Sequence, residues 1–253
     1  ALRIAALRLD LGWPPRGRLL AAVSLLEKAR YLVSEREDKP TSSKPGAPFI
    51  TSTLQQAASS KLGFSASRTM QVAQKLYEGF DIGGEVTGLI TYMRTDGVDM
   101  DGSAISAARR VIGKEFGDAY VPDVPRKYTV KAKNAQEAHE AIRPTDLGRL
   151  PAMVARHLEP EQARLYELIW KRTIASQMES ASLERTTVDI AATVSGRDLE
   201  LRATGQVTLF DGFLTLYSED RDEPVEDDDS ERRLPNLKQG DGVNPKEIKP
   251  EQH

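Results

Sequence analysis

The chain has 253 residues, of which 39% are hydrophobic and 29% charged, and this composition excludes a fibrous or intrinsically disordered protein. It contains no cysteine, which excludes a disulfide scaffold, a cysteine-ligated metal site and a thiol nucleophile. The net charge of −3 depends on residues 219–231, which hold nine acids and one base; the remainder carries 34 Lys and Arg against 29 Asp and Glu. Such a mildly basic body permits nucleic-acid binding without requiring it. We interpret the acidic stretch as a solvated loop.

The first 50 residues alternate between extended and helical patterns. Residues 2–11 alternate apolar and polar side chains, as a strand does, and residues 19–30 have helical spacing. Residues 31–37 are predicted to be extended again. Residues 38–48 contain three prolines and a glycine, which predicts a linker or a crossing between subdomains.

The middle of the chain has the pattern of short capped helices. Each expected helix has a Ser or Thr in front of it as an N-cap and a glycine behind it. The expected caps and stops are Thr51 or Ser52 with Gly63, Ser65 or Ser67 with Gly79, and Ser103 with Gly117. Pro160 is expected in the first turn of a fourth helix, which continues through residues 163–173.

After about residue 180 the period of the apolar residues becomes two. Val188, Ile190, Ala192 and Val194 lead to a turn at residues 195–198, and alternating apolar residues follow it, which predicts a β-hairpin. Beyond the hairpin, Val207, Leu209, Leu214 and Leu216 are predicted to continue as short strands around Asp211 and Gly212.

Strands at both ends of the chain and helices between them predict an α+β fold. The economical arrangement is a β-rich subdomain formed by both chain ends, with an all-helical subdomain inserted into it. The expected boundaries are residues 1–50 for the first part of the β subdomain, 51–179 for the helical subdomain, and 180–253 for the second β part with the acidic loop 219–231.

The most informative stretch is residues 88–97, which we call the tyrosine segment. An apolar, strand-like run delivers Tyr92, then Arg94, then a Thr-Asp-Gly turn. In an extended chain, side chains two positions apart project to the same side, so a phenol and a guanidinium could bind one anion. A phenol with an ordinary pKa of about 10 is scarcely ionised at pH 7, so a neighbouring cation helps a tyrosine that attacks a phosphodiester. Taken alone, the segment also fits a half-buried strand tyrosine beside a surface arginine.

Four segments are similar to those of a known protein family: residues 22–30, 44–56, the tyrosine segment and residues 136–145. Through them the chain resembles bacterial DNA topoisomerase I, the type IA family, along nearly its whole length. The resemblance implies that the β-rich subdomain forms an arch and that the helical subdomain bears the active-site tyrosine. The chain begins with Ala rather than Met and lacks the family's N-terminal Toprim domain and cysteine-rich zinc modules, so we expect a central fragment. The resemblance also places candidate hinges at residues 39–48 and near Ser180.

In this family the matching tyrosine attacks single-stranded DNA, forms a 5′-phosphotyrosyl bond, lets the other strand pass and reseals the break. The resemblance therefore implies that Tyr92 is the nucleophile and that Arg94 binds the scissile phosphate. It also implies that the intact enzyme relaxes negatively supercoiled DNA without a nucleotide. Further residues that it places at the DNA or beside the tyrosine are His139, Arg143, Thr91, Thr95, Asp96, Gln74 and Glu78.

Two of these residues have an alternative structural role. His139 would then be an ordinary structural histidine, and Arg143 would brace the turn at Pro144 rather than contact DNA. Magnesium is expected only in the intact enzyme, where Asp-x-Asp-x-Glu carboxylates of the Toprim domain bind it. Asp227, Asp229 and Glu231 have the same spacing, but no strand precedes them, so we expect no metal bound by this chain.

The leading hypothesis is therefore a catalytic fragment that is inactive in DNA relaxation by itself, because half of the active site would lie in the Toprim domain. The alternative is a non-catalytic module that binds single-stranded nucleic acid through Lys, Arg and aromatic side chains. A tyrosine recombinase or type IB enzyme is disfavoured, because it needs an Arg-rich catalytic set ahead of a tyrosine near the end of the chain, whereas Tyr92 precedes His139 and Arg143. The expected partners are single-stranded DNA, negatively supercoiled DNA and the remaining domains of the same enzyme.

We expect a monomer in the cytoplasm, since the substrate is DNA and no targeting signal is visible. Residues 19–26, the longest apolar stretch, include a serine and are followed by Glu27 and Lys28. This stretch is too short to span a membrane, so no membrane partner is expected.

Overall fold

The structure is a computed structural model, and it describes residues 23–24, 26–81, 86–128, 140–194, 197–218, 233–245 and 248. The predicted strand over residues 2–11 and the acidic loop 219–231 lie outside the described residues, as do residues 19–22 and 25 of the predicted helix over 19–30. The predicted mixture of helices and strands is confirmed. The chain divides into two compact units: residues 1–43, 182–210 and 223–253 form the sheet unit, and residues 44–181 and 211–222 form the helical unit.

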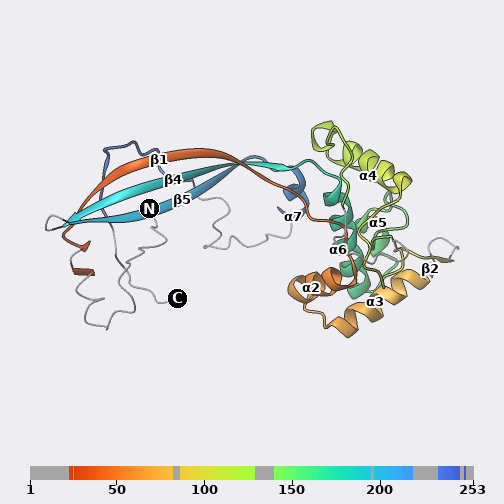
Figure 1. Ribbon diagram of the computed structural model, residues 1–253. Coiled ribbons are helices and arrows are strands. Elements are labelled where there is room, and N and C mark those ends of the chain that lie inside the picture. Colours follow the sequence, from red (N-terminus) through yellow and green to blue (C-terminus); the bar gives the residue numbers. More distant parts are fainter. Residues whose placement is uncertain are drawn as a thin grey trace. The chain divides into compact units, whose positions relative to one another are not determined.

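The sheet unit contains four strands in the order β5-β4-β1-β6, of which the three long ones run side by side in Figure 1. They are β1 (Arg30–Ser43), β4 (Ala181–Val194), β5 (Arg197–Phe210) and β6 (Gly242–Val243). The predicted hairpin is confirmed, because β4 and β5 pair antiparallel, with Val188 opposite Ala203 and Ile190 opposite Leu201. These residues are buried together with Tyr31 of β1, since a period of two places them on one face of the sheet.

Two predicted boundaries in this part of the chain are wrong. The strand β1 continues through Ser43, so residues 38–43 of the predicted linker belong to the sheet. On its outer edge β1 pairs with β6 only at Tyr31 and Leu32.

The second wrong prediction concerns the residues after β5, which ends at Phe210. The predicted strands around Leu214 and Leu216 are instead the short helices η2 (Gly212–Leu214) and α7 (Thr215–Ser218). The chain turns at Gly212, where φ is +51° and a β-carbon would lie 2.6 Å from the carbonyl oxygens of Glu179 and Ser180. Only glycine fits this approach, and the turn ends the extended conformation.

The helical unit is built around α6 (Pro160–Ser176), which packs against α2 (Thr51–Leu62), α3 (Ala66–Glu78), α4 (Gly102–Glu115) and α5 (Pro151–Ala155) (Figure 1). Besides η2 and α7, its short elements are β2 (Phe80–Asp81), β3 (Val86–Thr87) and η1 (Asp118–Tyr120). The helix α6 is buried on most sides, and its largest core residues are Leu165, Tyr166, Ile169, Trp170 and Ile174. Within the described part of the chain, no helix is both long and apolar enough to cross a membrane.

The predicted helix ends agree with the structure at five places. Gly79 is the C-cap of α3, and Gly117 directly follows the C-cap of α4. The hydroxyl of Ser65 caps α3 by accepting from the Arg68 amide at 3.1 Å. Pro160 stands in the first turn of α6, and Gly63 ends α2 in the left-handed conformation, with φ +71°. The predicted caps of the other two helices are wrong.

At the start of α2 the N-cap is Ile50, whose amide donates to the Thr53 hydroxyl at 3.0 Å. Thr51 lies inside the helix, because its hydroxyl is bonded to the tyrosine segment. At the start of α4 the cap is Asp101, which accepts from the Ser103 amide at 2.7 Å. A carboxylate two residues before Ser103 thus replaces the expected hydroxyl cap.

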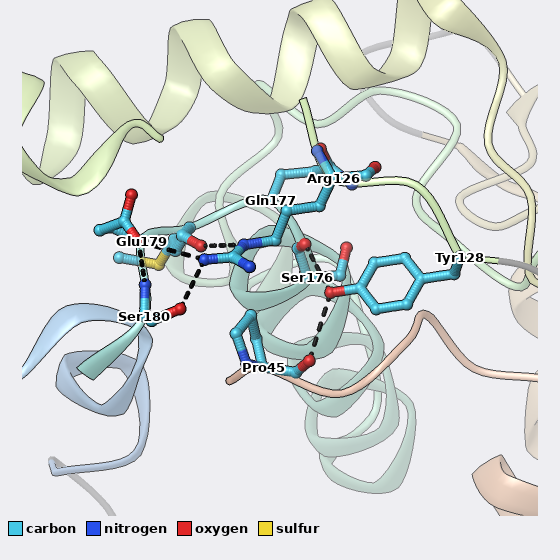
Figure 2. Close-up of polar contacts among 8 residues, drawn as sticks. Pro45, Arg126, Tyr128, Ser176, Gln177, Glu179 and Ser180 are labelled. Carbon is cyan, nitrogen blue, oxygen red and sulfur yellow. Dashed lines mark hydrogen bonds and ion pairs between the residues drawn. The ribbon is translucent and has the colours of Figure 1, made fainter. Parts of the chain in front are cut away.

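Residues 118–128, which we call the tie segment, bond to the places where the chain enters and leaves the helical unit, near residues 45, 176–180 and 211. The guanidinium of Arg126 donates to the Met178 carbonyl at 2.7 Å and to the Ser180 hydroxyl at 2.8 Å, and pairs with Glu179 at 3.2 Å (Figure 2). The side-chain amide of Gln177 donates to the Arg126 carbonyl at 3.1 Å. The stretch just after α6 is therefore fixed to the tie segment at four successive residues.

Two tyrosines of the tie segment form hydrogen bonds to residues near the other boundaries of the helical unit, at Pro45 and Asp211. The hydroxyl of Tyr128 lies 2.9 Å from the Ser176 carbonyl oxygen and 3.3 Å from that of Pro45 (Figure 2). The hydroxyl of Tyr120 donates to the carboxylate of Asp211 at 2.9 Å. Burial raises the pKa of Tyr128, and the hydrogen bond to Asp211 raises the pKa of Tyr120, so both phenols remain donors at neutral pH.

Replacing Arg126 with alanine is expected to lower the free energy of unfolding of the helical unit by about 2 kcal/mol. The substitution removes charge-assisted bonds of a side chain that is only 20% exposed, and it leaves the Met178 carbonyl without this donor. Hydrogen exchange of the buried α6 amides measures the change. The control is Arg110→Ala on the exposed face of α4, which is expected to change exchange little, and equal effects of the two variants would contradict the prediction.

Candidate active site

The tyrosine segment lies between α3 and α4 and pairs on one side with residues 143–145. The Thr91 amide donates to the Arg143 carbonyl at 2.9 Å, and the Thr145 amide donates to the Leu89 carbonyl at 3.0 Å. The hydroxyl of Thr91 adds two bonds, since it donates to the Ala141 carbonyl at 2.7 Å and accepts from the Arg143 amide at 3.0 Å. The residue before Tyr92 is thus fixed through both its backbone and its side chain.

On its other side the tyrosine segment is held by the first turn of α2. The Thr51 amide donates to the Thr95 carbonyl at 2.9 Å. The Thr51 hydroxyl accepts from the Thr95 amide at 2.9 Å and donates to the Met93 carbonyl at 2.8 Å. Because a side chain of α2 takes up these backbone groups, the segment bends at residues 93–94 instead of continuing as the strand that its sequence suggests.

Exposure alternates along the bent segment. Met93 is 1% exposed and Thr95 is buried, whereas Tyr92, Arg94 and Asp96 are exposed. The apolar side chain of Met93 therefore anchors the segment in the core of the helical unit, and the phenol and the guanidinium face solvent. This is the alternation that the sequence predicts for residues two positions apart, in spite of the bend.

A pocket of about 420 Å³ opens beside Arg94. It brings together three predicted site residues and four residues from the start of α2: Arg94, Thr95, Asp96, Ile50, Thr51, Ser52 and Gln55. A guanidinium beside hydroxyls and an amide can bind a phosphate, while the carboxylate of Asp96 limits how much negative charge the pocket accepts. Ser52, which was expected only as an N-cap, and Gln55 were not predicted as site residues, although both lie in residues 44–56, one of the segments that carry the resemblance.

Arg143 contacts its own turn. Its Nε donates to the carboxylate of Glu140 at 2.5 Å, its Nη1 donates to the Pro144 carbonyl at 2.9 Å, and the side chain is 13% exposed. Glu140 in turn accepts from the amide of Asp101 at 3.1 Å. Hydrogen bonds from the Ser103 hydroxyl and amide lower the pKa of Asp101. These contacts fit a residue that braces the turn at Pro144, and Glu140 links that turn to the N-cap of α4.

The remaining predicted site residues lie elsewhere. Gln74 and Glu78 are on α3, where the Gln74 amide group donates to the Glu78 carboxylate at 2.7 Å, and neither lines the pocket. His139, Asp227, Asp229 and Glu231 lie outside the described residues. In the part of the chain that the structure describes, no three His, Asp or Glu side chains form a cluster that could hold a metal ion.

A family model described as DNA topoisomerase matches residues 18–253. The chain belongs to the DNA topoisomerase family. Its relatives include DNA topoisomerase 1 of Zymomonas mobilis, 56% identical over 236 residues, and that of Xylella fastidiosa strain Temecula1, 50% identical over 228 residues. These matches cover 92% and 89% of this chain but only 18% and 28% of the relatives, so the chain spans less than a third of either topoisomerase.

The fold agrees with this assignment. Full-length topoisomerase I from Thermotoga maritima matches with a TM-score of 0.73 and 34% sequence identity. The match covers 92% of this chain and 35% of the Thermotoga chain. The resemblance to bacterial topoisomerase I that the sequence segments indicate is therefore confirmed.

In this topoisomerase chain, Thr91→Val is expected to loosen the pairing between the tyrosine segment and residues 141–145. The valine leaves the Arg143 amide and the Ala141 carbonyl without the hydroxyl partner, which destabilises the pairing by about 1–3 kcal/mol. Hydrogen exchange of the Arg143 amide is expected to accelerate about 5- to 150-fold. The matched control is Thr145→Val, whose hydroxyl bond to the Gly88 carbonyl is exposed to solvent and is expected to matter less. Unchanged exchange in Thr91→Val would refute this role of the hydroxyl.

Proposed function

We propose that the chain carries the DNA-cleaving tyrosine of a type IA topoisomerase, with Tyr92 as the nucleophile and Arg94 as the cation that binds the scissile phosphate. One observation carries the proposal: the tyrosine segment is fixed on both sides by hydrogen bonds, yet it presents Tyr92, 45% exposed, and Arg94 to solvent. A nucleophile that attacks a large polymer must be accessible and must also be rigidly placed.

The proposed reaction is a reversible transesterification. The phenolic oxygen of Tyr92 attacks phosphorus, a new O–P bond forms, and the bond from phosphorus to the 3′ oxygen breaks. The phenol loses its proton, and the departing 3′ oxygen takes up a proton to become a free hydroxyl. The 5′ end remains attached as a phosphotyrosine, so the bond energy is conserved and attack by the 3′ hydroxyl reseals the strand without a nucleotide.

Arg94 supports both directions of this reaction. Its guanidinium stands next to the pocket at the start of α2 and can stabilise the negative charge on the pentacoordinate phosphorus. Thr95 and Asp96 flank the same pocket, and the buried Thr95 keeps its backbone bonded to Thr51. The side chains of Ser52 and Gln55 would then contact the DNA backbone or bases next to the cleavage point.

The proposal extends to the whole enzyme. The substrates are single-stranded and negatively supercoiled DNA in the cytoplasm, and Mg²⁺ is held by Toprim carboxylates in another domain. The sheet unit forms an arch that carries the helical unit as an insertion, and this is supported by strands that come from both sides of the helical unit in sequence. The proposed boundaries of the inserted subdomain are 50/51 and 179/180, close to the divisions between the two compact units at 43/44 and 181/182. The chain by itself is expected not to relax supercoiled DNA.

The test uses a chimera in which this chain replaces the matching part of Zymomonas mobilis topoisomerase 1, to which it is 56% identical over 236 residues. The chimera is mixed with Mg²⁺ and end-labelled single-stranded DNA and then denatured. We expect labelled protein, its complete loss in Tyr92→Phe, and a fall of about 100- to 1,000-fold in the rate of adduct formation in Arg94→Ala. Neither variant is expected to lose single-stranded DNA binding altogether.

The matched controls for these variants are Tyr128→Phe and Arg110→Ala, which lie outside the site and are expected to form the adduct. An adduct that persists in Tyr92→Phe would disprove the assignment of the nucleophile. A chimera that binds single-stranded DNA but forms no adduct would favour the alternative, a non-catalytic binding module whose affinity falls with salt.

A further inference from the structure

Near the end of α3 the ring of Tyr77 lies against the ring of Tyr92. The ring centroids are 5.5 Å apart and the ring planes meet at 65°, an edge-to-face contact. Both rings are exposed, Tyr77 at 41% and Tyr92 at 45%, so neither is enclosed by the core. Among the described residues, this is the only hydrogen bond, ion pair or ring contact that the Tyr92 side chain makes.

The backbone holds the two tyrosines at a fixed separation. The Leu89 amide, three residues before Tyr92, donates to the Leu76 carbonyl at 2.8 Å. A β-carbon at Gly88 would lie 2.5 Å from the carbonyl oxygen of Tyr77, so no other residue fits there without movement of the backbone. The last turn of α3 and the start of the tyrosine segment are therefore packed as one piece.

We propose that Tyr77 is a positioning residue for the nucleophile: its ring selects the rotamer of Tyr92 from which the hydroxyl attacks the scissile phosphate. This inference rests on the proposed function of Tyr92. A half-exposed tyrosine ring without a partner samples several staggered rotamers, whereas attack requires one orientation in which the oxygen approaches phosphorus closely. The Tyr77 ring restricts that sampling from a place that the packing of α3 keeps fixed.

The size of the effect follows from the kind of contact. An edge-to-face aromatic pair shifts a conformational equilibrium by roughly 2- to 12-fold. The contact is between the two rings, and the proposed role does not involve the Tyr77 hydroxyl. Phenylalanine at position 77 should therefore preserve the effect, and an aliphatic residue should remove it.

The experiment measures the rate of adduct formation by the Zymomonas chimera at saturating end-labelled single-stranded DNA with Mg²⁺. Tyr77→Leu is expected to slow the reaction roughly 2- to 12-fold, with unchanged affinity for the DNA, and Tyr77→Phe is expected to restore the rate of the unmodified chimera. The control is Met153→Ala on α5, a side chain that is 55% exposed and outside the site, and it should leave the rate unchanged.

A second measurement uses this chain alone and needs no catalysis. With 3-fluorotyrosine incorporated, the ¹⁹F resonance of Tyr92 is identified by its loss in Tyr92→Phe. It is expected to shift in Tyr77→Leu, which removes the neighbouring ring, and to stay near its original position in Tyr77→Phe.

The outcomes separate the two proposals. An unmodified chimera that forms no adduct overturns the proposed function of Tyr92. An adduct that forms equally fast in Tyr77→Leu, or a Tyr92 resonance that does not shift, overturns the positioning role alone. Equal slowing in Tyr77→Phe and Tyr77→Leu also overturns it, because the hydroxyl rather than the ring would then be responsible. Tyr77 is 41% exposed, so its replacement is expected to leave the helical unit folded. The melting temperatures of the variants check this.

Discussion

The exposed position of Tyr92 depends on the hydrogen bonds between Thr51 and the tyrosine segment. A threonine offers one amide donor and a hydroxyl that can donate and accept at once. Thr51 uses all three functions on the backbone of Met93 and Thr95, two residues that flank Arg94. A bent segment without strand neighbours on this side would otherwise leave backbone groups unpaired. The rest of the site follows, since Met93 can be buried only if its carbonyl has a partner.

The rigidity of the site comes from deeper in the helical unit. The helix α6 supplies a buried core, α2 and α3 pack on it, and these two helices contact the tyrosine segment through Thr51 and Leu76. Tyr92, the proposed nucleophile, thus stands on an irregular segment whose backbone groups are hydrogen-bonded on both sides. This combination, a loop placed by a rigid scaffold, is common at catalytic sites because it joins access with fixed geometry.

The sequence predicted best those features that depend on neighbours along the chain. The period of two at residues 188–194 predicted the hairpin, and Ser65 and Gly63 marked real helix ends, because these patterns are local. Long-range contacts overrode local patterns elsewhere. Thr51 fits an N-cap locally, but its partners lie 42 and 44 residues away. The ring contact between Tyr77 in the last turn of α3 and Tyr92 in the tyrosine segment also follows from no sequence periodicity.

Family membership could be predicted because it rests on long ordered segments rather than on single residues. Within the site, the sequence pointed to Tyr92 and Arg94 but missed Ser52 and Gln55, whose side chains reach the pocket only after α2 has folded onto the tyrosine segment. The alternation at Leu214 and Leu216 suggested strands, but the tight turn at Gly212 ends the extended chain and these residues form short helices.

The long hairpin of β4 and β5 begins and ends at one place in the helical unit. The chain leaves the helical unit at residues 179–181 and returns at Gly212, whose β-carbon position lies 2.6 Å from the Ser180 carbonyl oxygen, and the Phe213 amide bonds to the Glu179 carbonyl at 3.0 Å. The residues before β4 and the residues after β5 are thus in direct contact. Topologically the hairpin is a long loop, and loop length affects closure entropy only slowly, by about 0.6 kcal/mol per doubling. Evolution can lengthen or shorten these strands while the scaffold that carries the tyrosine stays unchanged.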